Sequence, residues 1–164
     1  MDVKIVRLNK KFFISIFVIS ICFILDRFSK IYIINFFINN NINEYYINSY
    51  LNFILVWNKG IAFGLLESEN LNYLIITTFI FCIILFIVYM IVKSKAFTET
   101  LCFSIIVGGA LGNLFDRLYY KSVPDFIDLH YRDFHWFTFN VSDIFITVSI
   151  MLLITFDLIK KKDE

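Results

Sequence analysis

Apolar residues in this chain are gathered into four long runs. Each is free of Asp, Glu, Lys and Arg; they extend from Phe12 to Leu25, Leu71 to Val92, Thr100 to Phe115 and Ile144 to Phe156. A helix needs roughly 20 residues to cross the hydrocarbon core of a bilayer, and only the second run reaches that length by itself. The other three spans must carry polar residues into the membrane at one end. We predict membrane-spanning helices at approximately 10–30, 71–92, 98–118 and 141–159.

The composition agrees with a membrane protein. The 164 residues are 59% hydrophobic and 18% charged, whereas a soluble domain is about 45–50% apolar and about 25% charged. The net charge of +1 gives no indication of a nucleic-acid partner. The basic N-terminus followed by an apolar run resembles a secretory signal peptide, but no small-x-small cleavage site follows it. We therefore keep this run as the first span and predict one membrane-embedded domain covering 1–164.

The basic residues predict the orientation of the four spans. Nine of the fifteen lie in three short stretches: Lys4, Arg7, Lys10 and Lys11; Lys93 and Lys95; and Lys160, Lys161 and Lys162. With four spans these stretches share one side of the membrane, which the positive-inside rule assigns to the cytoplasm. We expect an all-α membrane protein with both ends in the cytoplasm.

The segments that face outward differ from ordinary loops. Residues 31–66 are rich in β-branched and aromatic residues on both sides of an Asn-rich turn, which favours β-structure. We expect a small extracytoplasmic β-sheet there, lying on the membrane surface with Trp57 at headgroup level. Residues 118–140 form a shorter connection that contains the only proline, Pro124.

Four aspartates are predicted to lie at the same depth in the membrane. Asp26 ends the first span, Asp116 ends the third, Asp143 begins the fourth, and Asp125 lies in the connection between the last two. Ionisable residues at membrane depth indicate function by default, although such residues can also simply contact lipid headgroups. Two carboxylates held close together cannot both ionise easily, so one stays protonated beside a charged partner. Such a pair can activate water and protonate a leaving amine, as in aspartic proteases.

The third span also has a packing motif. Gly108 and Gly112 are four residues apart on one helix face, a spacing that permits close contact between helices. Asn113, Asp116 and Arg117 follow one to two turns later. We expect this close-packed helix to hold those polar groups firmly at the outer end of the membrane.

Five blocks of sequence resemble one known family over nearly the whole chain. They are Asp26-Arg-Phe-Ser-Lys30, Asn58-Lys-Gly60-Ile-Ala62-Phe63, Gly108-Gly-Ala-Leu-Gly-Asn113-Leu-Phe-Asp116-Arg117, Val123-Pro-Asp125-Phe126 and Phe139-Asn140-Val-Ser-Asp143. In these blocks, their order and their position relative to the spans, the chain resembles the bacterial lipoprotein signal peptidases, also called signal peptidase II.

The resemblance implies a membrane aspartic endopeptidase that removes the signal peptide from prolipoproteins by cleaving before a diacylglyceryl-modified cysteine. It implies no cofactor and no metal, a monomer among membrane lipids, and a place in the bacterial inner membrane with the active site facing outward. The catalytic aspartates of the family match Asp125 and Asp143. The residues that bind substrate or support this pair match Asp26, Lys30, Asn58, Gly60, Asn113, Arg117 and Asn140. Asp116 is expected to form a structural ion pair with its neighbour Arg117.

The chain departs from the usual family pattern at Ile61, Pro124 and Ser142. Pro124 removes an N–H donor just before Asp125, and Ser142 adds a hydroxyl beside Asp143. Neither change removes a carboxylate, so we expect the activity to be retained. We also expect the aromatic segment 31–66 to clamp the substrate, with Trp57 and Phe63 as contacts.

Three alternative interpretations are weaker. Ser29 and Lys30 suggest a serine-lysine peptidase, but adjacent helix residues do not face one another. His130 and His135, with Asp133 between them, suggest zinc, but their spacing outside a helix is a weak ligand pattern and solvated loop histidines are the favoured interpretation. A non-enzymatic scaffold or a transporter is a third possibility, but transporters place charges near the bilayer midplane.

Overall fold

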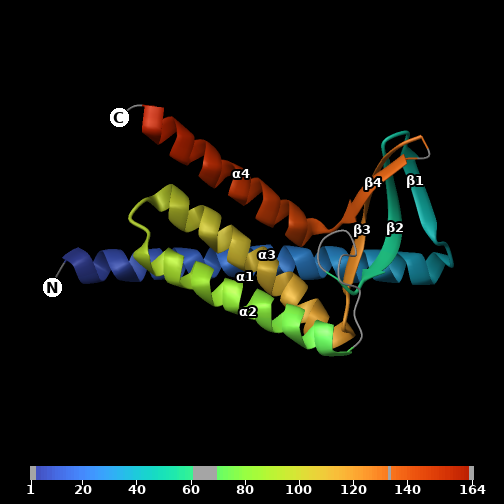
Figure 1. The fold of residues 1–164 in the computed structure, drawn as a ribbon, viewed down its shortest axis with the longest axis horizontal. Helices are drawn as coiled ribbons and strands as arrows, with labels where there is room; N and C mark the ends of the chain where they lie inside the picture. The colour runs from blue at the N-terminus through green and yellow to red at the C-terminus, as the bar shows by residue number, and fades with distance from the viewer. Residues whose placement is uncertain (1–2, 61–69, 133, 163–164) are drawn as a thin grey trace.

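The computed structural model describes residues 3–60, 70–132 and 134–162. Four long helices lie alongside one another, and a small sheet stands at one end of them (Figure 1). In chain order the elements are α1 (Val3–Asn40), β1 (Glu44–Asn48), β2 (Leu51–Asn58), α2 (Asn70–Lys93), α3 (Phe97–Tyr120), β3 (Val123–Tyr131), β4 (Phe134–Phe139) and α4 (Val141–Lys162). The predicted fold class, four apolar helices with a small antiparallel sheet, is confirmed.

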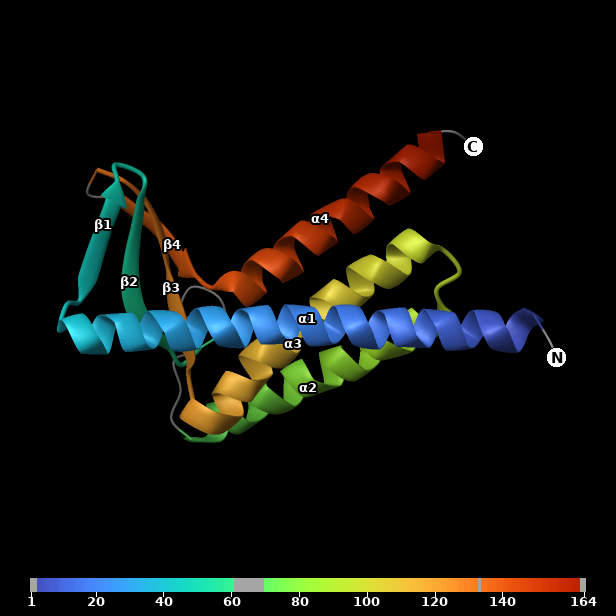
Figure 2. The ribbon, with the colours of Figure 1, turned by 180° about the vertical axis from the view of Figure 1, so that it is seen from behind.

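Both ends of the chain lie at the end of the helices opposite the sheet (Figures 1 and 2). The connection between α2 and α3 lies there as well, where the Lys11 ammonium donates a hydrogen bond to the Ser94 carbonyl at 2.5 Å. Each of the four helices contains a segment long and apolar enough to cross a bilayer. The protein is therefore an integral membrane protein.

Helix α3 is the central helix of the bundle and packs against the other three. In its most apolar stretch 61% of the residues are buried, against 11–22% in the other helices. Glycines permit this packing: a Cβ on Gly108 would lie 2.6 Å from the Cys22 Cβ on α1, and a Cβ on Gly109 would lie 2.8 Å from the Ser142 carbonyl oxygen on α4. Larger residues at these positions would push α1 and α4 away from α3.

The sheet consists of four antiparallel strands in the order β1-β2-β3-β4, so the pairing of β2 with β3 joins two hairpins. Phe126 on β3 is buried against Ile33 and Phe37 of α1, and this contact fixes the sheet on the long first helix. Figure 2 shows α1 running the length of the molecule to reach the sheet.

The extent of the predicted β segment was wrong at one end. Residues 31–40 continue α1 as helix, because Ile33 and Phe37, one turn apart, form an apolar stripe that is buried against Phe126. Strand propensity is strongly context-dependent, and this tertiary contact overrides it. The helix ends at Asn40, and the next residue, Asn41, has a φ of 49°, the left-handed conformation that Asn tolerates just after a helix.

The connection at 118–140 also differs from the prediction, because it contributes half of the sheet as β3 and β4. Pro124 obscured this strand. It occupies only the second position of β3, where the missing N–H disturbs the ladder least.

Candidate active site

Asp125 is held by two amide side chains from different parts of the chain. Asn58, at the end of β2, donates through Nδ2 to Asp125 Oδ2 at 2.9 Å, and Asn140 donates through Nδ2 to Asp125 Oδ1 at 2.6 Å. The side-chain oxygen Oδ1 of Asn58 accepts a hydrogen bond from the Gly60 N–H at 3.0 Å, which fixes the orientation of the Asn58 amide. Burial, and then the negative charge of Asp143, raise the pKa of Asp125 from 3.8 to about 6.

Asp143 is positioned by the first turn of α4. Asn140 is the residue before the helix and Asp143 lies three residues later. The Asn140 N–H donates to Asp143 Oδ2 at 3.0 Å, and the Asp143 N–H donates to Asn140 Oδ1 at 3.2 Å. This reciprocal pair is a capping box, so local helix chemistry dictates where the carboxylate stands. The remaining oxygen, Oδ1, accepts a hydrogen bond from Asn113 Nδ2 of α3 at 2.8 Å.

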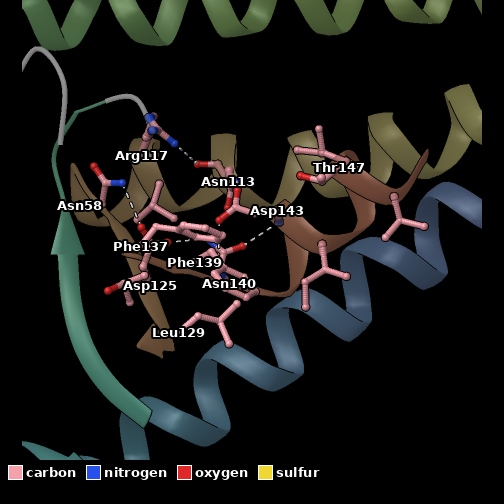
Figure 3. A pocket seen from close by; sticks show the side chains of 15 residues that line it. Asn58, Asn113, Arg117, Asp125, Leu129, Phe137, Phe139, Asn140, Asp143 and Thr147 are labelled. Carbon is pink, nitrogen blue, oxygen red and sulfur yellow. Dashed lines mark hydrogen bonds between the residues drawn. The ribbon is translucent and has the colours of Figure 1, made fainter. Parts of the chain in front are cut away.

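Asn140 brings the two carboxylates together. Its side-chain nitrogen binds Asp125, its side-chain oxygen and backbone nitrogen bind Asp143, and the residue is fully buried. Figure 3 shows Asp125, Asn140 and Asp143 around one cavity, with Asn58, Asn113 and Arg117 on the side nearer α3. The pair that the sequence predicted is therefore assembled from β3 and the N-terminus of α4.

Arg117 connects α3 with the end of β2. Its guanidinium Nη2 donates to the Gly60 carbonyl at 2.7 Å, and its own carbonyl accepts the Tyr73 hydroxyl at 2.6 Å. Arg117 lines the cavity together with Asn113, which lies one turn earlier on the same helix.

The predicted ion pair between Asp116 and Arg117 was wrong in its partner. Adjacent helix residues point about 100° apart, so Asp116 turns to α1 instead, where it pairs with Arg27 and, at 2.7 Å, with Lys30. Lys30 Nζ also lies 2.9 Å from the Asp26 carboxylate. These four charged groups form a buried and balanced cluster, which we call the Lys30 cluster: Asp26, Arg27, Lys30 and Asp116.

The Lys30 cluster lies behind the cavity rather than in its wall. Lys30 donates to Asn113 Oδ1 at 2.8 Å, and Asn113 in turn donates to Asp143, so the cluster contacts the carboxylate pair through one amide. Asp26 accepts the Ser142 N–H at 3.1 Å and so binds the start of α4. The serine-lysine alternative is wrong, because the Ser29 hydroxyl donates to the Asp26 carbonyl while Lys30 points at the two acids.

The cavity measures about 620 Å³ and has one polar end. Sequence analysis missed its apolar wall, which is formed by Leu129, Phe137, Phe139, Ile144, Ile146 and Val148. Two signals point to these residues. Residues two apart on β4 share a face with Phe139, and residues one turn beyond Asp143 share its side of α4.

Two predicted substrate contacts have different outcomes. Trp57 is outside the cavity lining and packs against Tyr120, with ring centroids 5.2 Å apart. Phe63 lies outside the described residues, as does Ile61.

The site holds two carboxylates, Asp125 buried and Asp143 half-buried, joined by one amide at the end of a membrane helix bundle, which is the arrangement that a membrane-embedded aspartic peptidase requires. A family model described as signal peptidase (SPase) II matches residues 18–159. The chain belongs to the signal peptidase II family and is a peptidase.

Individual relatives agree with this assignment. The lipoprotein signal peptidase of Pelagibacter ubique is 43% identical over 94% of this chain and 95% of its own. That of Anaplasma phagocytophilum is 38% identical over 93% and 96%. A solved bacterial membrane enzyme, 27% identical, superposes with a TM-score of 0.72 over 92% of this chain and 90% of its own.

Proposed function

We propose that this protein removes signal peptides from prolipoproteins, cleaving before the diacylglyceryl-modified cysteine, with Asp125 and Asp143 as its catalytic pair. The observation that supports this most directly is the position of Asn140, which hydrogen-bonds both carboxylates. Family membership and the printed names of the relatives point to the same substrate class.

The geometry suggests how hydrolysis proceeds. A water between the two carboxylates gives a proton to the charged one as its oxygen attacks the scissile carbonyl carbon. The protonated carboxyl donates its proton to the leaving amine as the C–N bond breaks, so that the pair is again singly protonated. Asn58 and Asn140 keep Asp125 in position, and Asn113 and the capping box keep Asp143 in position. The raised pKa of Asp125 supports sharing of one proton between them.

The cavity suits an apolar signal peptide. Its apolar wall runs along α4 from the carboxylate pair into the bundle, so an apolar segment can lie against Ile144 and Val148 while its polar end reaches Asp143. We infer that the substrate enters from the lipid. The scissile bond then meets the pair at the level where the spans end, without being pulled into water.

We infer the cellular orientation from the distribution of positive charge. Lys93 ends α2, Lys160 lies in the last turn of α4, and Lys11 contacts Ser94 just beyond α2. Those helix ends lie away from the sheet (Figure 1). By the positive-inside rule that end faces the cytoplasm, so we infer that the sheet and the carboxylate pair lie at the outer face of the inner membrane.

The polar groups of the site named above all come from one chain. We therefore propose that a monomer, folded as one domain, forms the complete site.

Two substitutions test the proposal. The Asp125→Asn and Asp143→Asn variants, purified in detergent and given a diacylglyceryl-modified prolipoprotein, are expected to lose at least about 10²–10⁴-fold in cleavage rate, because each removes one proton carrier. Asp157→Asn is the matched control, since Asp157 is exposed on α4 and pairs only locally with Lys161 at 2.8 Å. Wild-type cleavage by either carboxylate variant would overturn the proposal.

A further inference from the structure

The two histidines of this chain face a buried aspartate on the sheet. Asp128 and His130 lie on β3, and His135 lies on β4 as the register partner of His130. The predicted interpretation as solvated loop histidines is therefore wrong for His130, which is only 8% exposed, while the His135 side chain is 54% exposed. The strand pairing between β3 and β4 brings them together, and Asp133, named with them from the sequence, lies outside the described residues.

One ligand atom from each of the three side chains lies close enough to the others to share a metal ion. Asp128 Oδ2 lies 2.8 Å from His135 Nδ1 and 3.4 Å from His130 Nδ1. The imidazole rings stack with centroids 5.3 Å apart, and one ligand atom from each of the three residues falls within 4.8 Å of the others. Ligand atoms around a tetrahedral zinc ion lie about 3.3 Å from one another, given bonds of about 2.0–2.2 Å.

Polar atoms in this group lack hydrogen-bond partners. Asp128 is fully buried, yet within the described part of the chain its Oδ1 accepts no hydrogen bond, and the buried Nδ1 of His130 takes part in none. Among the described residues, the ion-pair partners of Asp128 are the two histidines. Leaving such atoms unpaired is costly, and one cation between them would satisfy both.

We propose that Asp128, His130 and His135 bind a zinc ion, with a water completing the coordination on the exposed side of His135. A set of two imidazoles and one carboxylate suits zinc better than magnesium or calcium, which prefer oxygen ligands throughout. The ion would tie β4 to β3 beside the irregularity in their pairing between Leu129 and His130.

This site is separate from the carboxylate pair. Residues two apart on a strand share a face, so Asp128 and His130 point to the side of β3 opposite Asp125 and Leu129, which line the cavity. The zinc ion would therefore stabilise the hairpin that carries one catalytic carboxylate and part of the apolar wall, without contacting the substrate.

The test measures zinc binding directly. The protein is purified without a histidine tag, stripped with a chelator, and titrated with Zn²⁺ in competition with a coloured zinc indicator. We expect one zinc ion per chain, and a melting temperature that rises with zinc concentration, because the ion binds only the folded sheet. X-ray absorption should show two imidazoles per zinc, and the chain contains only two histidines.

The variant His135→Gln separates a metal site from a hydrogen-bonded cluster. Because His135 is half exposed, this change leaves the core intact, and it should weaken zinc binding by at least about 10–100-fold and abolish the zinc-dependent rise in melting temperature. Asp157→Asn should bind zinc as the wild type does. Absence of stoichiometric zinc binding, or binding that is unchanged in His135→Gln, would overturn the proposal.

Discussion

Two groups of aspartates lie at the same end of the helix bundle and are stabilised in opposite ways. In the Lys30 cluster, Asp26 and Asp116 are paired with two cations at close range. Asp125 and Asp143 instead receive hydrogen bonds from the amides of Asn58, Asn113 and Asn140. Nearby cations favour the ionised form of a carboxylate more strongly than neutral amide donors do, so with amide partners the pKa of Asp125 is raised by burial and by the charge of Asp143.

The difference explains how one layer of the protein serves both structure and chemistry. The Lys30 cluster fixes α1 against α3 and, through Asp26, against the start of α4. The carboxylate pair is held by neutral groups, so the negative charge on it lowers the stability of the folded protein. Functional sites commonly carry such a cost in stability.

The difference between the two groups is tested most directly by making the same Asp→Asn substitution in each of them. Asp116→Asn should destabilise the protein by about 3–5 kcal/mol, because it leaves two buried cations sharing the single charge of Asp26. Asp125→Asn should cause no comparable loss at neutral pH, since it removes a buried charge that faces Asp143. Unfolding in a denaturing-detergent titration, followed by helical circular dichroism, measures both.

Asp157→Asn on the exposed part of α4 is the control for the change of residue type. If Asp125→Asn proved as destabilising as Asp116→Asn, then the carboxylate pair would be held as a structural element and the distinction between the two groups would fail.

The candidate site was predicted from span lengths and the family resemblance, and the structure adds a local reason for the position of Asp143. The block Asn140 to Asp143 is a helix-capping motif, which positions Asp143 by bonds within four residues. Span lengths predicted that Asp125 lies at the same depth, but its selection as the partner of Asp143 came from the family resemblance, because the meeting of β3 with α4 depends on strand pairing. The partner of Asp116 was missed for the same reason, since it lies on a different helix.

The fold was predictable where a physical constraint acts on a continuous segment. Membrane thickness and apolar run length predicted four spans, and charge distribution predicted which ends lie together. The helical extension through residues 31–40 was not predictable from propensity, because it depends on the contact of Ile33 and Phe37 with Phe126, about 90 residues away.

A second prediction uses the pH dependence of stability. Because the pKa of Asp125 is about 6 in the folded protein and 3.8 when exposed, the folded state binds a proton more tightly between these values. Stability from this group is therefore fully present below about pH 4 and is lost as the pH rises through about 6. The difference of about two pKa units corresponds to about 3 kcal/mol.

Asp125→Asn should remove this part of the pH dependence, and Asp157→Asn should retain it. Melting temperatures measured from pH 4 to pH 8 in one detergent check both. The prediction would fail if the melting temperature of the wild type rose from pH 4 to pH 8 with the same slope in Asp125→Asn. Ionisation of Asp125 would then not be what destabilises the folded protein.

The smallest expected effect concerns the amide that joins the pair. Asn140→Ser keeps a good helix-capping residue before α4 but is too short to reach Asp125, so it separates the two tasks of Asn140. Loss of a hydrogen bond to a charged group costs about 1.5–3 kcal/mol, which predicts a melting temperature several degrees below that of the wild type and, for the protein that remains folded, a cleavage rate lower by about 10–100-fold. Asn58→Ala removes the other bond to Asp125 but leaves the contacts of Asn140 with Asp143, so its rate should fall less. If Asn58→Ala lowered the rate more than Asn140→Ser, the carboxylates would be aligned from β2 and not from the start of α4.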